Sequence, residues 1–329
     1  MSTQAAADPL QRLLDRGGPA VGDALAAAEE RLRTVVADAG VPLAPAAAET
    51  IAAGGKRLRP LLVVLAASAG GVLEGQHVVR AAVAVELVHS ATLVHDDIVD
   101  GARLRRGRPT VVARHGRAAA VGTGDLLFSR AFAELAAGGE VEPLRILTRA
   151  SRALAAGELM QREDAYRRDV SVERYLRRCE LKTAALFEAA CALGALPAGD
   201  DLAGGLALFA RRIGLAFQLF DDVLDVAGGE EHTGKKAGAD LRDGTVTLPL
   251  IIASERDGAV ASVDLRELDG EASIAALCAR IAATGALESS RERALGYVAS
   301  AKEQLGTLLA PDRRVLLSLL ADAVVERRS

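Results

Sequence analysis

The chain has 329 residues, of which 50% are hydrophobic, 26% are charged and 3% are aromatic, and its formal net charge is −4. This composition is typical of a folded globular protein and is too poor in aromatic residues for a β-sandwich or barrel. Because the chain has neither a basic surplus nor aromatic residues on which bases could stack, we expect no nucleic-acid partner.

The sequence also indicates the cellular compartment in which the protein acts. Three widely spaced cysteines disfavour a disulfide framework and fit a reducing environment. The N-terminal segment carries charges at Asp8, Arg12 and Asp15 and no apolar block, unlike a secretory signal peptide. The longest uncharged apolar stretch, 60–73, is too short and too rich in glycine to span a bilayer. We therefore expect a cytoplasmic protein.

Apolar residues recur at intervals of three and four along most of the chain, as in residues 24–35, 83–98 and 206–220. This spacing is the helical period, and strict alternation is scarce. Breaks between helices are predicted where Gly, Pro and Asp cluster, at 17–19, 70–71, 138–143, 194–201 and 228–244. We expect about ten helices. The predicted organisation is a flexible N-terminal tail, 1–18, and a single all-α domain, 19–329.

Two of the predicted helices, 75–100 and 201–226, are apolar nearly all round, which is typical of the centre of a bundle. Each ends in an Asp-Asp-x-x-Asp cluster, formed by Asp96, Asp97 and Asp100 and by Asp221, Asp222 and Asp225. The first and last carboxylates of a cluster share a helical face and repel each other unless a hard cation such as Mg²⁺ lies between them. One such cluster could equally be a solvated helix end. Two copies on apolar helices favour a polyanion held through metal ions.

Two basic segments accompany these clusters. Residues 54–60 place Lys56, Arg57 and Arg59 after a pair of glycines, and residues 103–109 hold four arginines directly after the first Asp cluster. Arginine binds phosphate oxygens through two parallel hydrogen bonds, and lysine adds a point charge. Either segment alone would be interpreted as a solvated loop. Together with metal-binding carboxylates, they predict a site for two phosphorylated ligands.

An ordered set of motifs then becomes informative: GGKRLRP (54–60), LVHDDIVDGARLRRGRPT (93–110), GELMQ (157–161), ELKTAALF (180–187) and FQLFDDVLD (217–225). In these motifs the chain resembles the polyprenyl (trans-isoprenyl) diphosphate synthases. The resemblance implies an all-helical bundle around a deep central cavity, paired as a homodimer. It also implies the head-to-tail condensation of isopentenyl diphosphate with an allylic prenyl diphosphate.

The resemblance further implies a role for each matching residue. Magnesium, as three ions in the substrate complex, would be bound or supported by Asp96, Asp97, Asp100, Asp221, Asp222 and Asp225. The allylic diphosphate would be contacted by Arg105, Lys182 and Lys235. The isopentenyl diphosphate would be held by Gly55, Lys56, Arg59, His89 and Arg106. Thr183 and Gln218 would lie beside the developing allylic cation, where their dipoles stabilise it.

One position departs from the family pattern, which has a lysine where Thr245 follows Asp243 and Gly244. Lys236 or Arg242 could supply the missing charge. Three alternatives stay open. A class I terpene cyclase shares the first Asp motif, a partner-dependent subunit of a heteromeric synthase would explain Thr245, and a plain metal-binding bundle would explain only the carboxylates.

Product length is predicted from the residues that precede the first Asp cluster. One helical turn is about 5.4 Å, close to one isoprene unit, so residues one or two turns before Asp96 would limit the growing tail. Here these residues are Val88, Ala91 and Thr92, which are small. We therefore expect products longer than farnesyl diphosphate. Phe128 and Phe132 are predicted to form a lower floor of the cavity, or else to be ordinary core residues.

Overall fold

The structure is a computed structural model that describes residues 9–37, 43–228 and 237–326. Helices dominate, and the paired strands within these ranges form a single short hairpin. The predicted all-α fold class is therefore confirmed. The chain groups into two compact units of discontinuous segments, with unit 1 formed by 1–151, 186–210 and 308–317, and unit 2 by 152–185, 211–307 and 318–329. The single domain over 19–329 stays a prediction.

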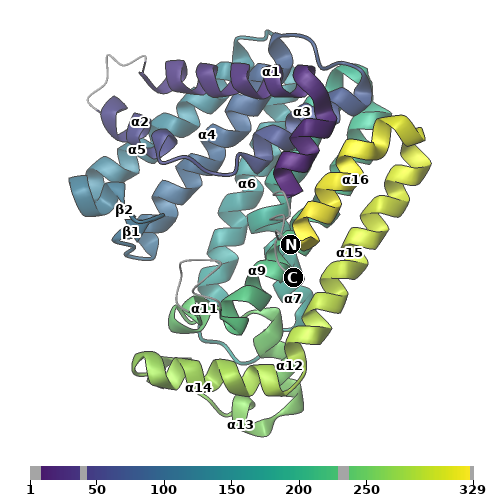
Figure 1. Ribbon diagram of the computed structural model, residues 1–329. Coiled ribbons are helices and arrows are strands. Elements are labelled where there is room, and N and C mark those ends of the chain that lie inside the picture. The colour runs from purple at the N-terminus through teal and green to yellow at the C-terminus, as the bar shows by residue number, and fades with distance from the viewer. Residues whose placement is uncertain (1–8, 38–42, 229–236, 327–329) are drawn as a thin grey trace, which may run out of the picture. The chain divides into compact units, whose positions relative to one another are not determined.

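Unit 1 contains most of the N-terminal helices (Figure 1). Its elements are α1 (Pro9–Ala37), α2 (Ala44–Ala52), α3 (Leu58–Gly70), α4 (Gln76–Val99), the strands β1 (Leu104–Arg105) and β2 (Arg108–Pro109), α5 (Val111–Ala136), the first part of α6 (Val141–Asp164), most of α8 (Ala185–Ala195), the short η2 (Leu196–Ala198) and the first part of α9 (Asp200–Ala227).

The core of unit 1 forms around α3 and α4. Residues 62–67 of α3 are fully buried on every side, and α4 packs along α5 and against α1. The backbones of α3 and α8 approach closely at Gly194, where a Cβ atom would lie 2.2 Å from the carbonyl oxygen of Val63. Because residues 62–67 of α3 and 81–88 of α4 are all buried, a polar residue within these stretches must be paired or must serve a ligand.

Unit 2 contains the second parts of α6 and α9 and most of the remaining helices. These are α7 (Val172–Cys179), the π-helix η1 (Glu180–Ala184), α11 (Ala239–Arg242), α12 (Leu248–Arg256), α13 (Gly258–Ala261), η3 (Leu265–Glu267), α14 (Gly270–Ala283) and α15 (Ala286–Leu308), while α16 (Pro311–Glu326) is shared with unit 1. Within unit 2, α12 packs against α7, α13 and α14 (Figure 1). Tyr175, Val223 and Leu248 are fully buried in its core.

The predicted boundaries are reproduced in part. The helices expected at 75–100 and 201–226 are α4 and α9, which agree with the prediction to within one residue at each end. In the segment predicted as a tail, residues 9–18 lie in α1, and Leu13 is fully buried. The expected break at 17–19 is an interruption of α1 at Gly18, whose φ of 70° and ψ of −175° are not helical. A left-handed φ of this kind favours glycine, so the predicted break is present and divides α1 into two helical segments.

Three helical segments are long and apolar enough, by length and composition alone, to cross a membrane: Gln76–Val99, Val172–Ala198 and Asp200–Ala227. Their most apolar windows are already 67%, 56% and 56% buried inside the protein. The first and last are α4 and α9, which end in the Asp clusters. Packing inside the protein therefore accounts for much of the apolar character of these helices.

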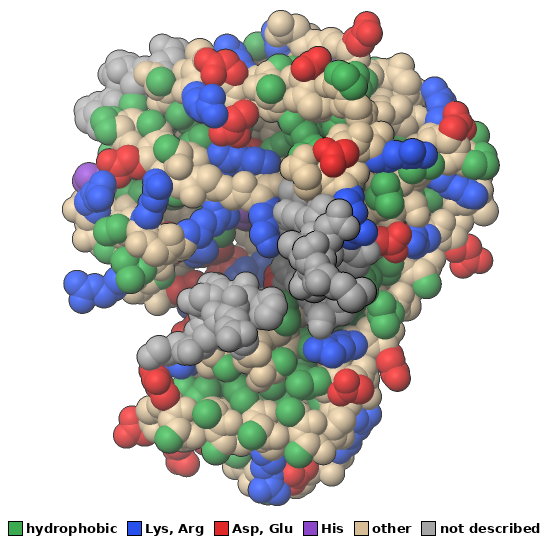
Figure 2. Space-filling model, in the orientation of Figure 1, with side chains coloured by type: hydrophobic (Ala, Val, Ile, Leu, Met, Phe, Trp, Pro, Cys, Tyr) green, Lys and Arg blue, Asp and Glu red, His purple; other side chains and the backbone are tan. Residues whose placement is uncertain are grey.

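Figure 2 shows acidic and basic side chains intermixed with hydrophobic ones on the face in view. The thiols of Cys179, Cys191 and Cys278 are free and buried. Burial raises the pKa of Cys179 to about 12 and that of Cys278 to about 11, and it also raises that of Cys191. All three are therefore protonated, unreactive core residues at neutral pH.

Candidate active site

The first Asp cluster forms the C-terminal end of α4 in unit 1. Asp96 is partly exposed and Asp100 is exposed, whereas Asp97 is only 4% exposed. Oδ1 of Asp97 accepts a hydrogen bond from Nε of Arg105 at 2.8 Å. Burial raises the pKa of Asp97, and Arg105 opposes this rise. Carboxylates in the last turn of a helix also face the negative end of its dipole, which disfavours their charge.

The basic segment that follows the cluster is the β1–β2 hairpin, in which Leu104 pairs with Pro109 and Arg105 with Arg108. Its two turn residues, Arg106 and Gly107, both have positive φ, at 53° and 73°. This is the pattern of a tight hairpin turn of type I′. The turn brings Arg106 against the glycine loop before α3, because a Cβ atom on Gly55 would lie 2.7 Å from its Nη1.

The residues expected to hold isopentenyl diphosphate gather in unit 1. The pKa of His89 is well below its usual value because the ring is buried and because Arg59 and Arg106 lie near it. Arg59 lies 5.2 Å from the centre of the Phe187 ring, and burial lowers its pKa to about 10. The buried Nε of Arg59 has no hydrogen-bond partner in the part of the chain that the structure describes. An unpaired, buried N–H group beside further cations fits a site that binds an anion.

The second Asp cluster lies near the end of α9 in unit 2. Asp222 is 3% exposed, and its two carboxylate oxygens accept hydrogen bonds from the Tyr175 hydroxyl at 2.6 Å and from Nε2 of Gln218 at 2.8 Å. Burial raises the pKa of Asp222 to about 6. Asp225 accepts hydrogen bonds from the backbone N–H groups of residues 239 and 240, at 3.0 and 3.1 Å. Asp222 and Asp225 are thus committed to protein partners, whereas Asp221 is partly exposed.

Thr183 and Gln218 are also in contact. Oγ1 of Thr183 donates a hydrogen bond to Oε1 of Gln218 at 2.7 Å, so both ends of the Gln218 amide are fixed. Thr183 and Lys182 lie in the π-helix η1, and Nζ of Lys182 is 2.5 Å from Oε2 of Glu158. Single π-turns are frequent at functional sites because they turn side chains away from the regular helical position.

Not every predicted site residue can be placed. Lys235, like Lys236, lies outside the described residues. Thr245 is partly exposed and its backbone N–H donates to the carbonyl of Asp240 at 2.8 Å. The two Asp clusters belong to different units, so their opposition across one metal site stays a prediction. Within the described ranges, no three His, Cys, Asp or Glu side chains are gathered as a ready-made metal site.

The fit of a metal rests on the donor chemistry of the two clusters. Both present carboxylate oxygens, which are the ligands that Mg²⁺ and Ca²⁺ prefer. Magnesium is usually bound by one or two carboxylates together with substrate phosphates, so a full set of protein ligands is not required. Asp96, Asp100 and Asp221 are exposed or partly exposed, and Asp225 is partly exposed but accepts hydrogen bonds from the backbone of residues 239 and 240. The three buried or capped members hold the surrounding structure.

The residues proposed to limit product length lie on α4 and α5, two helices that pack along each other. Val88 and Ala91 are fully buried, and Thr92 is partly exposed with its hydroxyl bonded to the carbonyl of His89 at 2.8 Å. Phe128 of α5 is partly exposed, and its ring centre lies 6.0 Å from that of His95. Phe132 is also partly exposed.

Several residues of the site are absent from the sequence prediction. Tyr175 and Glu158 hold predicted residues through a hydrogen bond and an ion pair. Gly157 lets α6 approach η1, because a Cβ atom there would lie 2.5 Å from the backbone nitrogen of Lys182. Gly157 and Glu158 are the first two residues of the GELMQ motif, and this motif is the sequence feature from which their role could have been predicted. Nothing in the sequence marks Tyr175.

Comparison with known proteins identifies the family to which the chain is similar. The sequence profile of the family described as Polyprenyl synthetase matches residues 42–274. The chain is 41% identical over 305 residues to heptaprenyl diphosphate synthase component 2 of Geobacillus stearothermophilus, covering 92% of this chain and 95% of that protein. It is 38% identical over 283 residues to geranylgeranyl diphosphate synthase of Methanosarcina mazei, covering 84% and 86%.

Solved structures give the same result. A polyprenyl synthase from Caulobacter crescentus, crystallised in complex with calcium and isoprenyl diphosphate, superimposes with a TM-score of 0.88 at 38% identity and covers 100% of both chains. The resemblance inferred from the motifs is thus confirmed, and the chain belongs to the polyprenyl synthetase family of prenyltransferases.

Proposed function

We propose that this prenyltransferase condenses isopentenyl diphosphate head to tail with an allylic prenyl diphosphate, with magnesium as its divalent cation. The observation that carries the proposal is the gathering of Arg59, His89 and Arg106 in the same unit as the carboxylates of Asp96 and Asp100. This combination provides direct cations for one diphosphate and metal-binding oxygens for another. The complex of the Caulobacter relative with calcium and isoprenyl diphosphate supports a need for a divalent metal.

The proposed roles follow from the surroundings of each residue. When bound, magnesium neutralises the diphosphate leaving group of the allylic substrate, and Asp96, Asp100 and Asp221 are the residues proposed to hold up to three ions. Arg105, oriented by Asp97, binds the allylic diphosphate together with Lys182 and Lys235. Gln218, fixed between Thr183 and Asp222, presents a preoriented dipole to the allylic cation.

The isopentenyl diphosphate is proposed to bind at Lys56, Arg59, His89 and Arg106. Since the pKa of His89 is well below its usual value, this ring is neutral at physiological pH and contributes an N–H donor without a charge. Attack of the alkene of isopentenyl diphosphate on the allylic carbon forms the new C–C bond and breaks the bond between that carbon and its diphosphate. The proton then lost is proposed to go to the released diphosphate.

The test is a product assay with purified protein, magnesium, labelled isopentenyl diphosphate and, in separate reactions, dimethylallyl, geranyl, farnesyl and geranylgeranyl diphosphate. Chain lengths are read after removal of the diphosphate. We expect a linear series that ends beyond farnesyl. Cyclic products would instead identify a terpene cyclase, and an absence of products from folded protein would contradict the proposal for the chain acting alone.

A second candidate function is that of a partner-dependent subunit. It is favoured by the likeness to a protein named component 2 and by Thr245 in place of a lysine.

We propose a homodimer that acts in the cytoplasm, with at most transient contact between its apolar product and a membrane. Measurement of mass in solution during turnover separates these cases, because activity of the pure protein as a homodimer excludes a required second chain.

Product length provides a further prediction. Replacing Ala91 with phenylalanine is expected to shorten the main product by at least one isoprene unit, since the larger ring would fill space one turn below Asp96. Chain-length analysis of the products checks it. Overpacking a fully buried site costs about 1–3 kcal/mol, so thermal unfolding is followed in parallel. If Ala91 is an ordinary core residue, the variant will unfold at a lower temperature with an unaltered product spectrum.

A further inference from the structure

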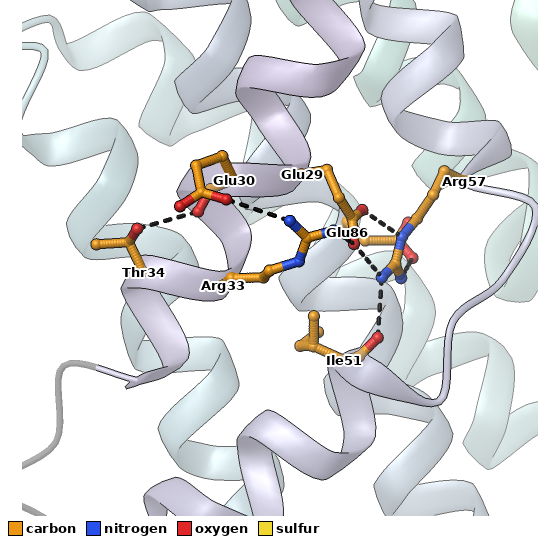
Figure 3. Close-up of polar contacts among 7 residues, drawn as sticks. All are labelled: Glu29, Glu30, Arg33, Thr34, Ile51, Arg57 and Glu86. Atoms are coloured by element: carbon orange, nitrogen blue, oxygen red, sulfur yellow. Dashed lines mark hydrogen bonds and ion pairs between the residues drawn. The ribbon is translucent and has the colours of Figure 1, made fainter.

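The basic loop before α3 contains an arginine that is fully engaged by other protein groups. Arg57 has a left-handed backbone conformation, with φ at 46°, at the N-terminus of α3. Its Nε and Nη2 donate to the carboxylate of Glu29 at 2.9 and 3.2 Å, and its Nη1 donates to Glu86 at 2.8 Å (Figure 3). Its Nη2 also donates to the carbonyl of Ile51 at 2.9 Å. A left-handed non-glycine residue is strained, so these four bonds hold a conformation that the chain would otherwise avoid.

Glu86 is unexpected in these surroundings. Its side chain is only 6% exposed, and the cations of Arg57, Arg59 and Arg106 act on it. A buried carboxylate within a group of cations that binds a diphosphate reduces the attraction of the site for that anion. The presence of Glu86 therefore needs a compensating benefit, and its contact with Arg57 is the one that Figure 3 shows.

Packing does not explain how Arg57 is held. Arg57 lines a cavity of about 290 Å³ between α1, α3 and α4, whose walls also include Leu25, Leu32 and Leu61. Part of the Arg57 surface therefore borders open space. Its orientation is set by the carboxylates on α1 and α4, because Glu29 and Glu86 approach it from two different helices.

We propose that Glu29 and Glu86 are positioning residues that act through Arg57 to fix the loop carrying Lys56 and Arg59, and so create the subsite for isopentenyl diphosphate. This inference rests on the proposed function of that loop. Arg57 lies between Lys56 and Arg59 in the sequence. The left-handed conformation of Arg57 determines how Lys56, before α3, is oriented relative to Arg59, in the first turn of α3. Arg57 is then a structural clamp, not a ligand of the diphosphate.

The direction in which the KM for isopentenyl diphosphate changes distinguishes a structural role of Arg57 from direct binding of the diphosphate. If Arg57 bound the diphosphate directly, neutralising Glu29 or Glu86 would release it and lower the KM for isopentenyl diphosphate. For a clamp, Glu29→Gln and Glu86→Gln are each expected to raise this KM about tenfold, because a hydrogen bond to a charged group is lost. We expect kcat and the KM for the allylic diphosphate to change less than about threefold, since those depend on other residues.

Three further variants complete the experiment. Arg57→Lys is expected to raise the same KM, because an ammonium cannot bridge two carboxylates as a guanidinium does. Combining Arg57→Lys with Glu29→Gln should add little to the larger single effect, since both variants disrupt the same contact between Arg57 and Glu29. Glu30→Gln is the matched control, because Glu30 follows Glu29 on α1 and, like Glu29, pairs with Arg33, but its side chain is exposed and it does not hydrogen-bond Arg57 (Figure 3).

Binding of isopentenyl diphosphate alone, measured by calorimetry, separates this inference from the proposed function. Wild-type protein that binds the ligand but forms no product would contradict the function, while the binding constants of the variants still decide the role of Arg57. Unchanged or tighter binding by Glu29→Gln and Glu86→Gln, in protein that unfolds at the wild-type temperature, would overturn the inference. Glu29 is 32% exposed, so its variant is the one least expected to disturb folding.

Discussion

Replacing Asp96 with asparagine is expected to reduce the rate of prenyl transfer by about a thousandfold while leaving the fold intact. Asp96 is a partly exposed carboxylate at the end of α4, where the helix dipole and its neighbour Asp100 both disfavour its charge. Loss of this charge should therefore not destabilise the helix. It should weaken the magnesium-assisted departure of the diphosphate, which is measured as kcat with saturating substrates.

The control for this variant is Asp201→Asn. Asp200 and Asp201 form another pair of adjacent carboxylates, but they lie in the first turn of α9 and are exposed. There the helix dipole favours negative charge, so the pair is explained without a metal. We expect activity to be unchanged in this control. Wild-type activity in Asp96→Asn would show that the first cluster is only a helix end.

Replacing Gly157 with alanine is expected to damage both stability and catalysis. The new Cβ atom would lie 2.5 Å from the backbone nitrogen of Lys182 and 2.8 Å from its Cα atom, so η1 must move. Overpacking of this kind costs about 1–3 kcal/mol. Misplacement of Thr183 relative to Gln218 should lower kcat by about a hundredfold, because a shift of 1 Å has an effect of this size.

Thermal unfolding and steady-state kinetics measure the two effects of Gly157→Ala. Gly204 in α9 is the matched position, because it is also helical but exposed, and a Cβ atom there meets nothing within 4 Å. Gly204→Ala should raise the unfolding free energy by about 0.4–1 kcal/mol, with no effect on kcat. A Gly157→Ala protein as stable and active as wild type would contradict the close approach of α6 and η1.

The sequence was sufficient for the central helices α4 and α9 and for their acidic ends, since each depends on a local pattern. Apolar residues at the helical period gave α4 to within one residue at each end. The β1–β2 hairpin was missed because strands of two residues leave no alternation to detect. The start of α1 was missed because Gly17, Gly18 and Pro19 are strong turn signals, although the structure uses them only to interrupt the helix.

The partners of the site residues could not be predicted, because they depend on contacts between distant segments. Arg57 was placed in a phosphate-binding loop, yet its carboxylate partners lie 28 and 29 residues away on different helices. Tyr175 is 47 residues from Asp222. A motif indicates which residues take part in the chemistry. It does not indicate which of them touch the substrate and which hold their neighbours in place.

The burial of all three thiols has a practical consequence for spectroscopy. Because Cys179, Cys191 and Cys278 are protonated and enclosed in the folded protein, a maleimide dye should react slowly with the wild-type chain. A cysteine introduced at an exposed position such as Arg103 would then be labelled selectively, without first removing the natural thiols. A fluorophore there would sit beside the first Asp cluster and could report substrate arrival in real time, on the unmodified core of the enzyme.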